Sequence, residues 1–271
     1  MRYAFMALAL VGCAAVPLEP PTGQTVEYAV TQQSWGANYV EALALGLDIN
    51  GDKSVDNQLG QVFSTMLARQ IDITGATGTL IERGQLRLTT SVQYARDSDP
   101  SDSIAFSTTV AGAPSPTPLL GEHTKAPMLA GPGELAIAFA FCGEPVTLAL
   151  AGAHVRIDRA DDSTMTGRIA GAVRPSDVNA ILVPNFARRL NEQVALECTD
   201  FAAADCGCIH TDVEYEANYW LELFDVAPHK DCVITAEEIL ASSLTMSLLS
   251  PDVTVDGDPM QSLGFAFEAR R

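Results

Sequence analysis

Apolar and polar residues alternate through the middle of the chain, which is the two-residue period of a β-strand with one buried face. The clearest example is Leu86–Tyr94. Between Leu135 and Phe141, large apolar residues alternate mostly with alanine, so we expect that strand to be buried on both faces. The same pattern predicts further antiparallel strands at residues 104–110, 146–150, 154–158, 165–173 and 263–267, whereas residues 111–132, rich in proline and glycine, are expected to form a long surface loop.

Helical periodicity lies before and after these strands. Apolar residues spaced three and four apart predict an amphipathic helix over Asn57–Gln70. A second stripe predicts a helix over residues 178–194, which Pro184 is expected to kink. Residues 38–46 fit either a strand or a short helix.

Two Thr-x-x-Glu sequences, beginning at Thr211 and Thr235, are typical of helix capping boxes. They predict two C-terminal helices, the second ending near Leu249. With the strands, these helices predict an α+β fold: a central antiparallel β-sheet with C-terminal helices, including a helix-loop-helix hairpin. A chain of 271 residues, 47% of them apolar, is long enough for one domain with a substantial core, which we place at residues 26–271.

The charge of the chain excludes one class of partner. It holds 34 acidic residues against 16 basic ones, a formal net charge of −18. A field of that sign repels the phosphates of nucleic acids and anionic lipid head groups. We therefore expect a solvated acidic surface and no nucleic-acid partner.

The N-terminus has the layout of a secretory signal peptide. Arg2 precedes an apolar run that is far shorter than the roughly 20 residues needed to span a bilayer. The run ends in Leu10-Val11-Gly12-Cys13, which resembles the lipobox of bacterial lipoproteins. The resemblance implies a signal peptide over residues 1–12, diacylglycerol and acyl groups on Cys13, and a proline-rich tether over residues 13–25. The alternative is an ordinary signal peptide with a chance cysteine.

The residue after the lipobox cysteine is Ala14 and not aspartate. By the sorting rule of the lipoprotein family, this implies the outer membrane. We therefore expect a protein of the cell envelope, facing the periplasm or the surface, whose contact with the membrane is its N-terminal lipid.

An oxidising compartment makes disulfide bonds the expected state of the other cysteines. Five remain, so one of them has no partner within the chain. We expect Cys198 to bond to Cys206 or Cys208, and a second bridge to involve Cys232 or Cys142. A zinc site formed by Cys198, Cys206, Cys208 and His210 is the alternative, although its spacing is unusual.

An acidic loop precedes the first predicted helix. In an EF-hand calcium loop, positions 1, 3, 5, 7, 9 and 12 supply oxygen ligands. With Asp48 at position 1, the predicted ligands of one calcium ion are Asp48, Asn50, Asp52, Ser54 through its carbonyl, and Asp56. Three acids this close together repel one another unless a cation lies between them.

Two positions depart from the calcium pattern. Lys53 stands where the loop needs glycine for a sharp turn, and Leu59 stands where it needs a bidentate acid. In the alternative interpretation, Asn50-Gly51 forms a turn and Asp56 caps the helix. That alternative does not explain acids at both 48 and 52, so we favour calcium as a structural ion.

A second, poorer calcium loop lies between the C-terminal helices. With Ile234 at position 8, Asp231 and Glu238 fall at positions 5 and 12. Asp225 serves position 1 only if the loop carries two extra residues. The alternative, which we favour, is a helical hairpin closed by the Thr235 capping box.

The two loops together resemble those of uncharacterised bacterial lipoproteins. These carry a D-x-[DN]-x-D-x-x-x-D-N-x-L-G box near the start, matched here from Asp48 to Gly60, and a degenerate EF-hand-like hairpin near the end. The resemblance implies no known activity. With asparagine at its third position, the first loop also resembles those of dockerin modules.

No nucleophile elbow, phosphate-binding loop or zinc-protease motif occurs in the sequence. We therefore expect a non-enzymatic, lipid-anchored envelope protein that binds calcium. A secreted hydrolase of envelope or environmental polymers is one alternative. A dockerin-like docking module is another, although dockerins duplicate their loop within a short span.

Labelling with palmitate tests the anchor. Cells that produce the full chain are expected to incorporate labelled palmitate into it. The Cys13→Ala variant is expected to lose the label, because the thiol that the lipid modifies is gone. Label retained in the variant would contradict lipidation at this residue.

Overall fold

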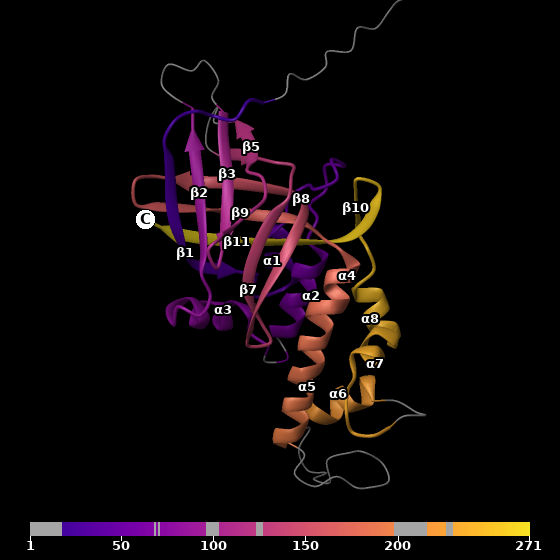
Figure 1. The fold of residues 1–271 in the computed structure, drawn as a ribbon. Helices are drawn as coiled ribbons and strands as arrows, with labels where there is room; N and C mark the ends of the chain where they lie inside the picture. The colour runs from indigo at the N-terminus through magenta and orange to yellow at the C-terminus, as the bar shows by residue number, and fades with distance from the viewer. Residues whose placement is uncertain are drawn as a thin grey trace, which may run out of the picture.

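The computed structural model describes residues 18–67, 69, 71–95, 103–122, 127–197, 216–225 and 230–271. These residues form an 11-stranded antiparallel sheet and several helices, which confirms the α+β prediction at that level (Figure 1). The strands are β1 (Thr25–Ser34), β2 (Leu88–Tyr94), β3 (Ser103–Val110), β4 (Ala113–Pro114), β5 (Leu119–Glu122), β6 (Met128–Ala130), β7 (Leu135–Phe141), β8 (Glu144–Ala160), β9 (Thr164–Val173), β10 (Val253–Val255) and β11 (Asp258–Arg270).

The sheet closes on itself. Its strand order is β1-β2-β3-β5-β6-β8-β9-β11-β10, and β1 also pairs with β11, with Ala29 opposite Arg270 and Ser34 opposite Ala266. The rings of Phe106 on β3 and Phe267 on β11 lie 6.3 Å apart although these strands are not neighbours in the sheet. Apolar side chains from separate strands therefore meet inside the closed sheet.

The structure corrects two predictions in this region. Residues predicted as two short strands form β8, one strand of 17 residues. A register shift between Ala151 and His154, next to Gly152 at a φ of 55°, marks a bulge that bends β8. The first half of β8 pairs with β7 and the second half with β6 and β9. The predicted loop over 111–132 contains β4, β5 and β6, because their few residues pair with the longer strands β3 and β8.

Strand β7 is buried, as predicted, but only one of its edges pairs with another strand, β8. Side chains bind the other edge. The Ala136 N–H donates to Ser115 Oγ over 3.0 Å, and Thr108 Oγ1 donates to the Ala136 carbonyl over 2.6 Å. The two hydroxyl oxygens lie 2.8 Å apart and bond to each other. Thr108 and Ser115 thus satisfy both backbone groups of one residue.

Side chains also bond to the backbone farther along this edge of β7, where a neighbouring strand would otherwise bond. Gln33 Nε2 donates to the Ala138 carbonyl over 2.8 Å, and the Ala140 N–H donates to Thr77 Oγ1 over 2.9 Å. A buried peptide group without a partner costs about as much as a lost hydrogen bond, roughly 1–3 kcal/mol. These polar side chains therefore make it possible to bury β7 although only one of its edges pairs with a strand.

The helices pack beside the sheet, and Figure 1 shows α5–α8 grouped on one side of the molecule. The segment 38–46, which fitted either a strand or a short helix, is helical. Asn38 Oδ1 accepts the Glu41 N–H over 3.0 Å and so caps this helix. The described helices are α1 (Tyr39–Leu45), α2 (Gln58–Leu67), α3 (Ile73–Glu82), α4 (Pro175–Asp177), the π-helix η1 (Val178–Leu182), α5 (Val183–Glu197), α6 (Glu216–Phe224), α7 (Ala236–Ala241) and α8 (Ser243–Leu248). None of these helices has the length and apolar character to cross a bilayer.

The predicted long helices differ from expectation in detail. Pro184 follows the π-helical turn η1, at whose end the Val183 N–H bonds to the Val178 carbonyl. Proline lacks an N–H and crowds the preceding turn, and a wider turn relieves that crowding. The helix predicted from Thr235 is interrupted at Ser242, whose ψ of 132° is extended. The predicted start at Thr211 lies outside the described residues.

Replacing Thr77 with valine tests the bonding of the β7 edge. Thr77→Val keeps the shape of the side chain but removes the acceptor for the buried Ala140 N–H, so we expect a loss of about 1–3 kcal/mol in the free energy of unfolding. Urea denaturation measures it. The matched control is Thr79→Val on the exposed side of α3, where the hydroxyl bonds only to its own helix. Equal effects of the two substitutions would contradict the assigned role.

Candidate functional site

The acidic loop connects α1 to α2, and its ends are joined. Leu47 and Asp56 form an isolated β-bridge, in which the Asp56 N–H donates to the Leu47 carbonyl over 3.0 Å. The residues between them are therefore held as one closed turn. Four of the five predicted ligands lie inside this turn, and the fifth, Asp56, forms its end.

The first three predicted ligands fold over the loop backbone. Asp48 accepts the Gly51 N–H over 2.7 Å with Oδ1 and the Lys53 N–H over 3.0 Å with Oδ2. Asn50 Oδ1 accepts the Asp52 N–H over 3.0 Å, and Asp52 Oδ1 accepts the Ser54 N–H over 2.7 Å. These successive turns direct the side-chain oxygens of positions 1, 3 and 5 onto backbone N–H groups of the same loop.

The loop also makes its sharp turn without the expected glycine. Lys53 has a φ of 72°, in the left-handed region that glycine usually occupies, and Gly51 has a φ of 81°. Such a conformation costs a non-glycine residue roughly 1–2 kcal/mol. Lys53 therefore takes the backbone conformation of position 6, and this departure in sequence does not prevent the turn.

Asp56 has a different role from the other acids. It is only 8% exposed, and its Oδ2 accepts the Ile49 N–H over 2.9 Å. Burial raises the pKa of the Asp56 carboxyl, and the nearby charges of Asp52, Asp252 and Asp48 raise it further, while the hydrogen bond from Ile49 opposes them. Asp56 thus ties the two ends of the loop together. It does not cap the helix, so the interpretation of Asp56 as a helix cap is wrong.

Asn57 caps α2 and also joins it to the sheet. It is 1% exposed, and its Oδ1 accepts the Gly60 N–H over 3.2 Å and the Gly264 N–H over 2.7 Å. Its Nδ2 donates to the Ala42 carbonyl over 2.6 Å and to the Gly264 carbonyl over 3.1 Å. One side chain thus connects α1, α2 and β11. No local sequence pattern predicted this role of Asn57, although the residue belongs to the box matched from Asp48 to Gly60.

Packing explains the residues at the last positions of the box and the glycine that precedes it. A Cβ on Gly60 would lie 2.3 Å from Asn57 Oδ1, and one on Gly46 would lie 2.3 Å from the Asp56 carbonyl oxygen, so neither position has room for a side chain. Leu59, at position 12, is fully buried in the core. Val55, at position 8, is exposed instead of facing the core. The loop therefore departs from an EF-hand in its last third.

The second predicted loop uses its acids to hold the backbone. Asp225 is buried and accepts the Asp231 and Cys232 N–H groups over 3.1 and 2.9 Å. Glu238 Oε2 accepts the N–H and hydroxyl of Thr235, each over 2.9 Å, which confirms the predicted capping box. The Glu238 carboxylate is thus engaged at the start of α7.

The cysteines divide into two groups. Cys142 is a free and buried thiol, and burial raises its pKa to about 12, so its prediction as a disulfide partner is wrong. It packs in the apolar core of the described residues. Cys232 is disulfide-bonded. The remaining candidates, Cys198, Cys206 and Cys208, lie outside the described residues, as does the predicted lipidation site Cys13.

Within the part of the chain that the structure describes, no three His, Cys, Asp or Glu side chains are grouped as a metal site. No protein-family model, curated protein or solved structure matches the chain. The candidate site therefore rests on the geometry of the loop itself.

Replacing Asn57 with alanine tests the connection between the loop and the sheet. Asn57→Ala leaves the buried backbone groups of Gly264 and the Ala42 carbonyl without their partner, so we expect a loss of about 2–4 kcal/mol in the free energy of unfolding. Urea denaturation checks it. Asn185→Ala is the control, because the Asn185 amide donates to the Ile181 carbonyl one turn earlier in η1, and its loss should cost less than about 1 kcal/mol. A loss no larger than that of the control would contradict the role of Asn57.

Proposed function

We propose that this chain is a non-catalytic protein of the cell envelope, anchored to the outer membrane through lipid on Cys13, whose loop Asp48–Asp56 binds one calcium ion as a structural ion. One observation carries the calcium site. Asp48, Asn50 and Asp52 all accept N–H groups of the loop, so three oxygen-bearing side chains are held against one short stretch of backbone.

Calcium is a hard cation that binds six to eight oxygens. Asp48, Asn50 and Asp52 would hold it with their side chains, and Ser54 with its carbonyl. The hydrogen bond from the Ser54 N–H holds the pKa of the Asp52 carboxyl below its usual range, which keeps this ligand ionised. Asp56 and Leu59 do not fit as ligands, so water completes the shell.

The charges around the loop also support a cation. Asp52, Asp252 and Asp48 all raise the pKa of Asp56, which means that three carboxylates repel a negative charge on Asp56. A divalent cation held by two of them reduces that repulsion. With few protein ligands, we expect weak binding, in the range of about 10⁻⁴ to 10⁻³ M seen in extracellular modules.

For the C-terminal region, we propose a helix-loop-helix hairpin without a metal. Helices α6 and α7 flank the loop that Asp225 holds by its two hydrogen bonds. Asn191 on α5 both accepts the Ile234 N–H and donates to the Ile234 carbonyl, which fastens the end of this loop to the longest helix.

Thermal unfolding with calcium and with chelator tests the site. At about 10 mM calcium, a site of the expected affinity stabilises the folded chain by roughly 1.4–2.7 kcal/mol and raises Tm by roughly 3 to 10 °C. The variant Asp48→Asn plus Asp52→Asn is expected to lose this shift, because it keeps acceptors for the turns but removes the charges.

The matched control is Asp158→Asn plus Asp162→Asn, which removes the same charge from the end of β8 and the turn that follows it and should keep the calcium shift. If the original chain shows no shift, or if both double variants shift equally, the loop does not bind calcium specifically.

A further inference from the structure

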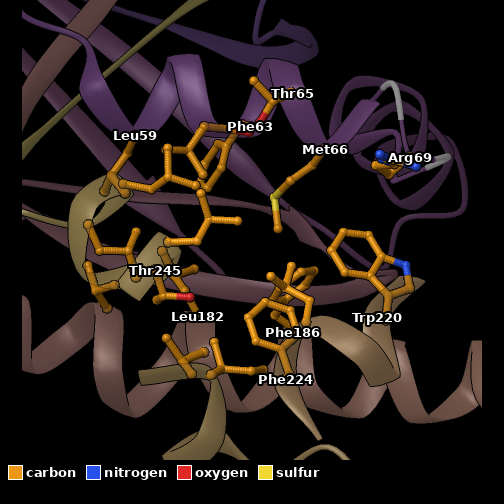
Figure 2. Close-up of a pocket in the computed structure, with 18 of the residues that line it drawn as sticks. Leu59, Phe63, Thr65, Met66, Arg69, Leu182, Phe186, Trp220, Phe224 and Thr245 are labelled. Carbon is orange, nitrogen blue, oxygen red and sulfur yellow. Dashed lines mark hydrogen bonds between the residues drawn. The ribbon is translucent and has the colours of Figure 1, made fainter. Parts of the chain in front are cut away.

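A cavity of about 190 Å³ lies between the helices, and we call it the helical cavity (Figure 2). Its walls come from α2, from η1 and α5, and from the C-terminal helices α6–α8, with one residue from β7. The residues that line it are mostly apolar. Ordered water needs two to four polar partners, and an apolar space stays dry even when it is roomy. Internal water is therefore expected elsewhere, where buried polar atoms lack partners.

Two such atoms lie at the end of β1. Gln33 and Trp35 are 1% and 2% exposed, and neither Gln33 Oε1 nor Trp35 Nε1 has a hydrogen-bond partner among the described residues. The other two buried side-chain atoms in this state, Thr90 Oγ1 and Gln261 Oε1, belong to separate strands, β2 and β11. The Gln33 oxygen only accepts a hydrogen bond and the Trp35 nitrogen only donates one, so a molecule that does both would satisfy the pair.

A bulge in β1 turns both side chains to the same face. The register against β11 shifts between Val30 and Gln32, so Thr31 is an extra residue in β1. Without the bulge, the alternation of the strand would turn Gln32 inward. With it, Thr31 and Gln32 are both exposed, and Gln33 and Trp35 are buried instead. The acceptor and the donor therefore lie two residues apart on one buried face.

Both side chains also lie against the same part of β7. Gln33 Nε2 donates to the Ala138 carbonyl over 2.8 Å. A carbonyl oxygen only accepts, so the amide nitrogen of Gln33 must face β7, and its Oε1 is left to bond elsewhere. The Trp35 ring lies 4.6 Å from the ring of Phe139, the next residue of β7. Contacts with two adjacent residues of β7 thus keep Gln33 and Trp35 together.

We infer that one ordered water molecule bridges Gln33 and Trp35, in the space that the β1 bulge and the small Ala138 side chain leave. It accepts the indole N–H of Trp35 and donates to Gln33 Oε1. Residues two apart in a strand are separated by roughly 6.5 Å, and a water with hydrogen bonds of roughly 2.8 Å joins atoms up to about 5.6 Å apart, so converging side chains bring the two atoms within its reach. The site shares no residue with the acidic loop and does not depend on calcium.

The other candidate partner of the indole N–H is an aromatic face. Phe63 meets Trp35 at an interplanar angle of 64° with ring centroids 5.6 Å apart, a geometry that allows an N–H···π contact. That contact would leave Gln33 Oε1 without a partner, whereas a water satisfies both atoms. The two buried atoms together therefore favour the water.

Nuclear Overhauser spectroscopy between water and the ¹⁵N-labelled full chain tests the site. The chain has two tryptophans, so the Trp220→Phe variant assigns the indole proton of Trp35. We expect a cross peak between this proton and water whose sign is opposite in the laboratory-frame and rotating-frame spectra, which marks a long-lived bound water and not hydrogen exchange. Surface water does not produce it, because Trp35 is buried. Absence of this cross peak overturns the inference, and an upfield shift of the indole proton would then assign the Phe63 contact.

Two variants test whether Gln33 is the second partner. Gln33→Met keeps a side chain of similar length but removes Oε1, so we expect the cross peak to disappear. Thr77→Val is the matched control, because it removes another side-chain bond to the same edge of β7, at Ala140, but neither partner of the water, and it should retain the cross peak. A cross peak that persists in folded Gln33→Met, or one that is lost equally from both variants, overturns the bridge. The measurement on the unmodified chain decides the question even if Gln33→Met does not fold.

Discussion

The free edge of β7 is the constraint on which the rest of the structure depends. This strand is buried on both faces but pairs only with β8, and the side chains of Gln33, Thr77, Thr108 and Ser115 satisfy its other edge. These residues come from β1, α3, β3 and the segment after β4. Because buried peptide groups need partners, the position of β7 fixes four separate parts of the chain relative to one another.

The buried β7 in turn supports the aromatic core. Its Phe139 and Phe141 contact Phe63 on α2, with ring centroids 5.9 and 5.3 Å apart, and Phe139 also contacts Trp35 at 4.6 Å. Trp35 stacks on Phe265 of β11 at 4.5 Å. The aromatic side chains therefore carry the packing from the closed sheet through β7 to α2, where the helical layer begins.

Helix α2 connects the acidic loop to the helical cavity. Its first turn is held by Asn57, which bonds to Gly264 of β11, and the acidic loop lies directly before it. Its buried residues then line the helical cavity. The acids of the box hold the loop, whereas Asn57 and Gly60 hold the start of α2. One short sequence thus serves two structural purposes. A leucine at position 12 belongs to the core and cavity wall, which explains why that position carries no acid.

Local patterns were enough to predict strand β2, which begins at Leu88 and not at Leu86, the burial of β7, helix α2 and the Thr235 capping box. Each of these depends on residues within a few positions of one another. The closure of β1 on β11, the unbroken β8 and the bonds of Asn57 to a residue 207 positions away depend on partners that no local pattern contains. The same holds for the helical cavity, whose wall comes from segments between Leu59 and Leu249. The acidic residues of the loop were evident from their spacing. Only the tertiary structure decided that the Asp56 carboxylate turns toward Ile49. The ends of the loop are buried, and the buried Ile49 N–H needs an acceptor, which Asp56 supplies.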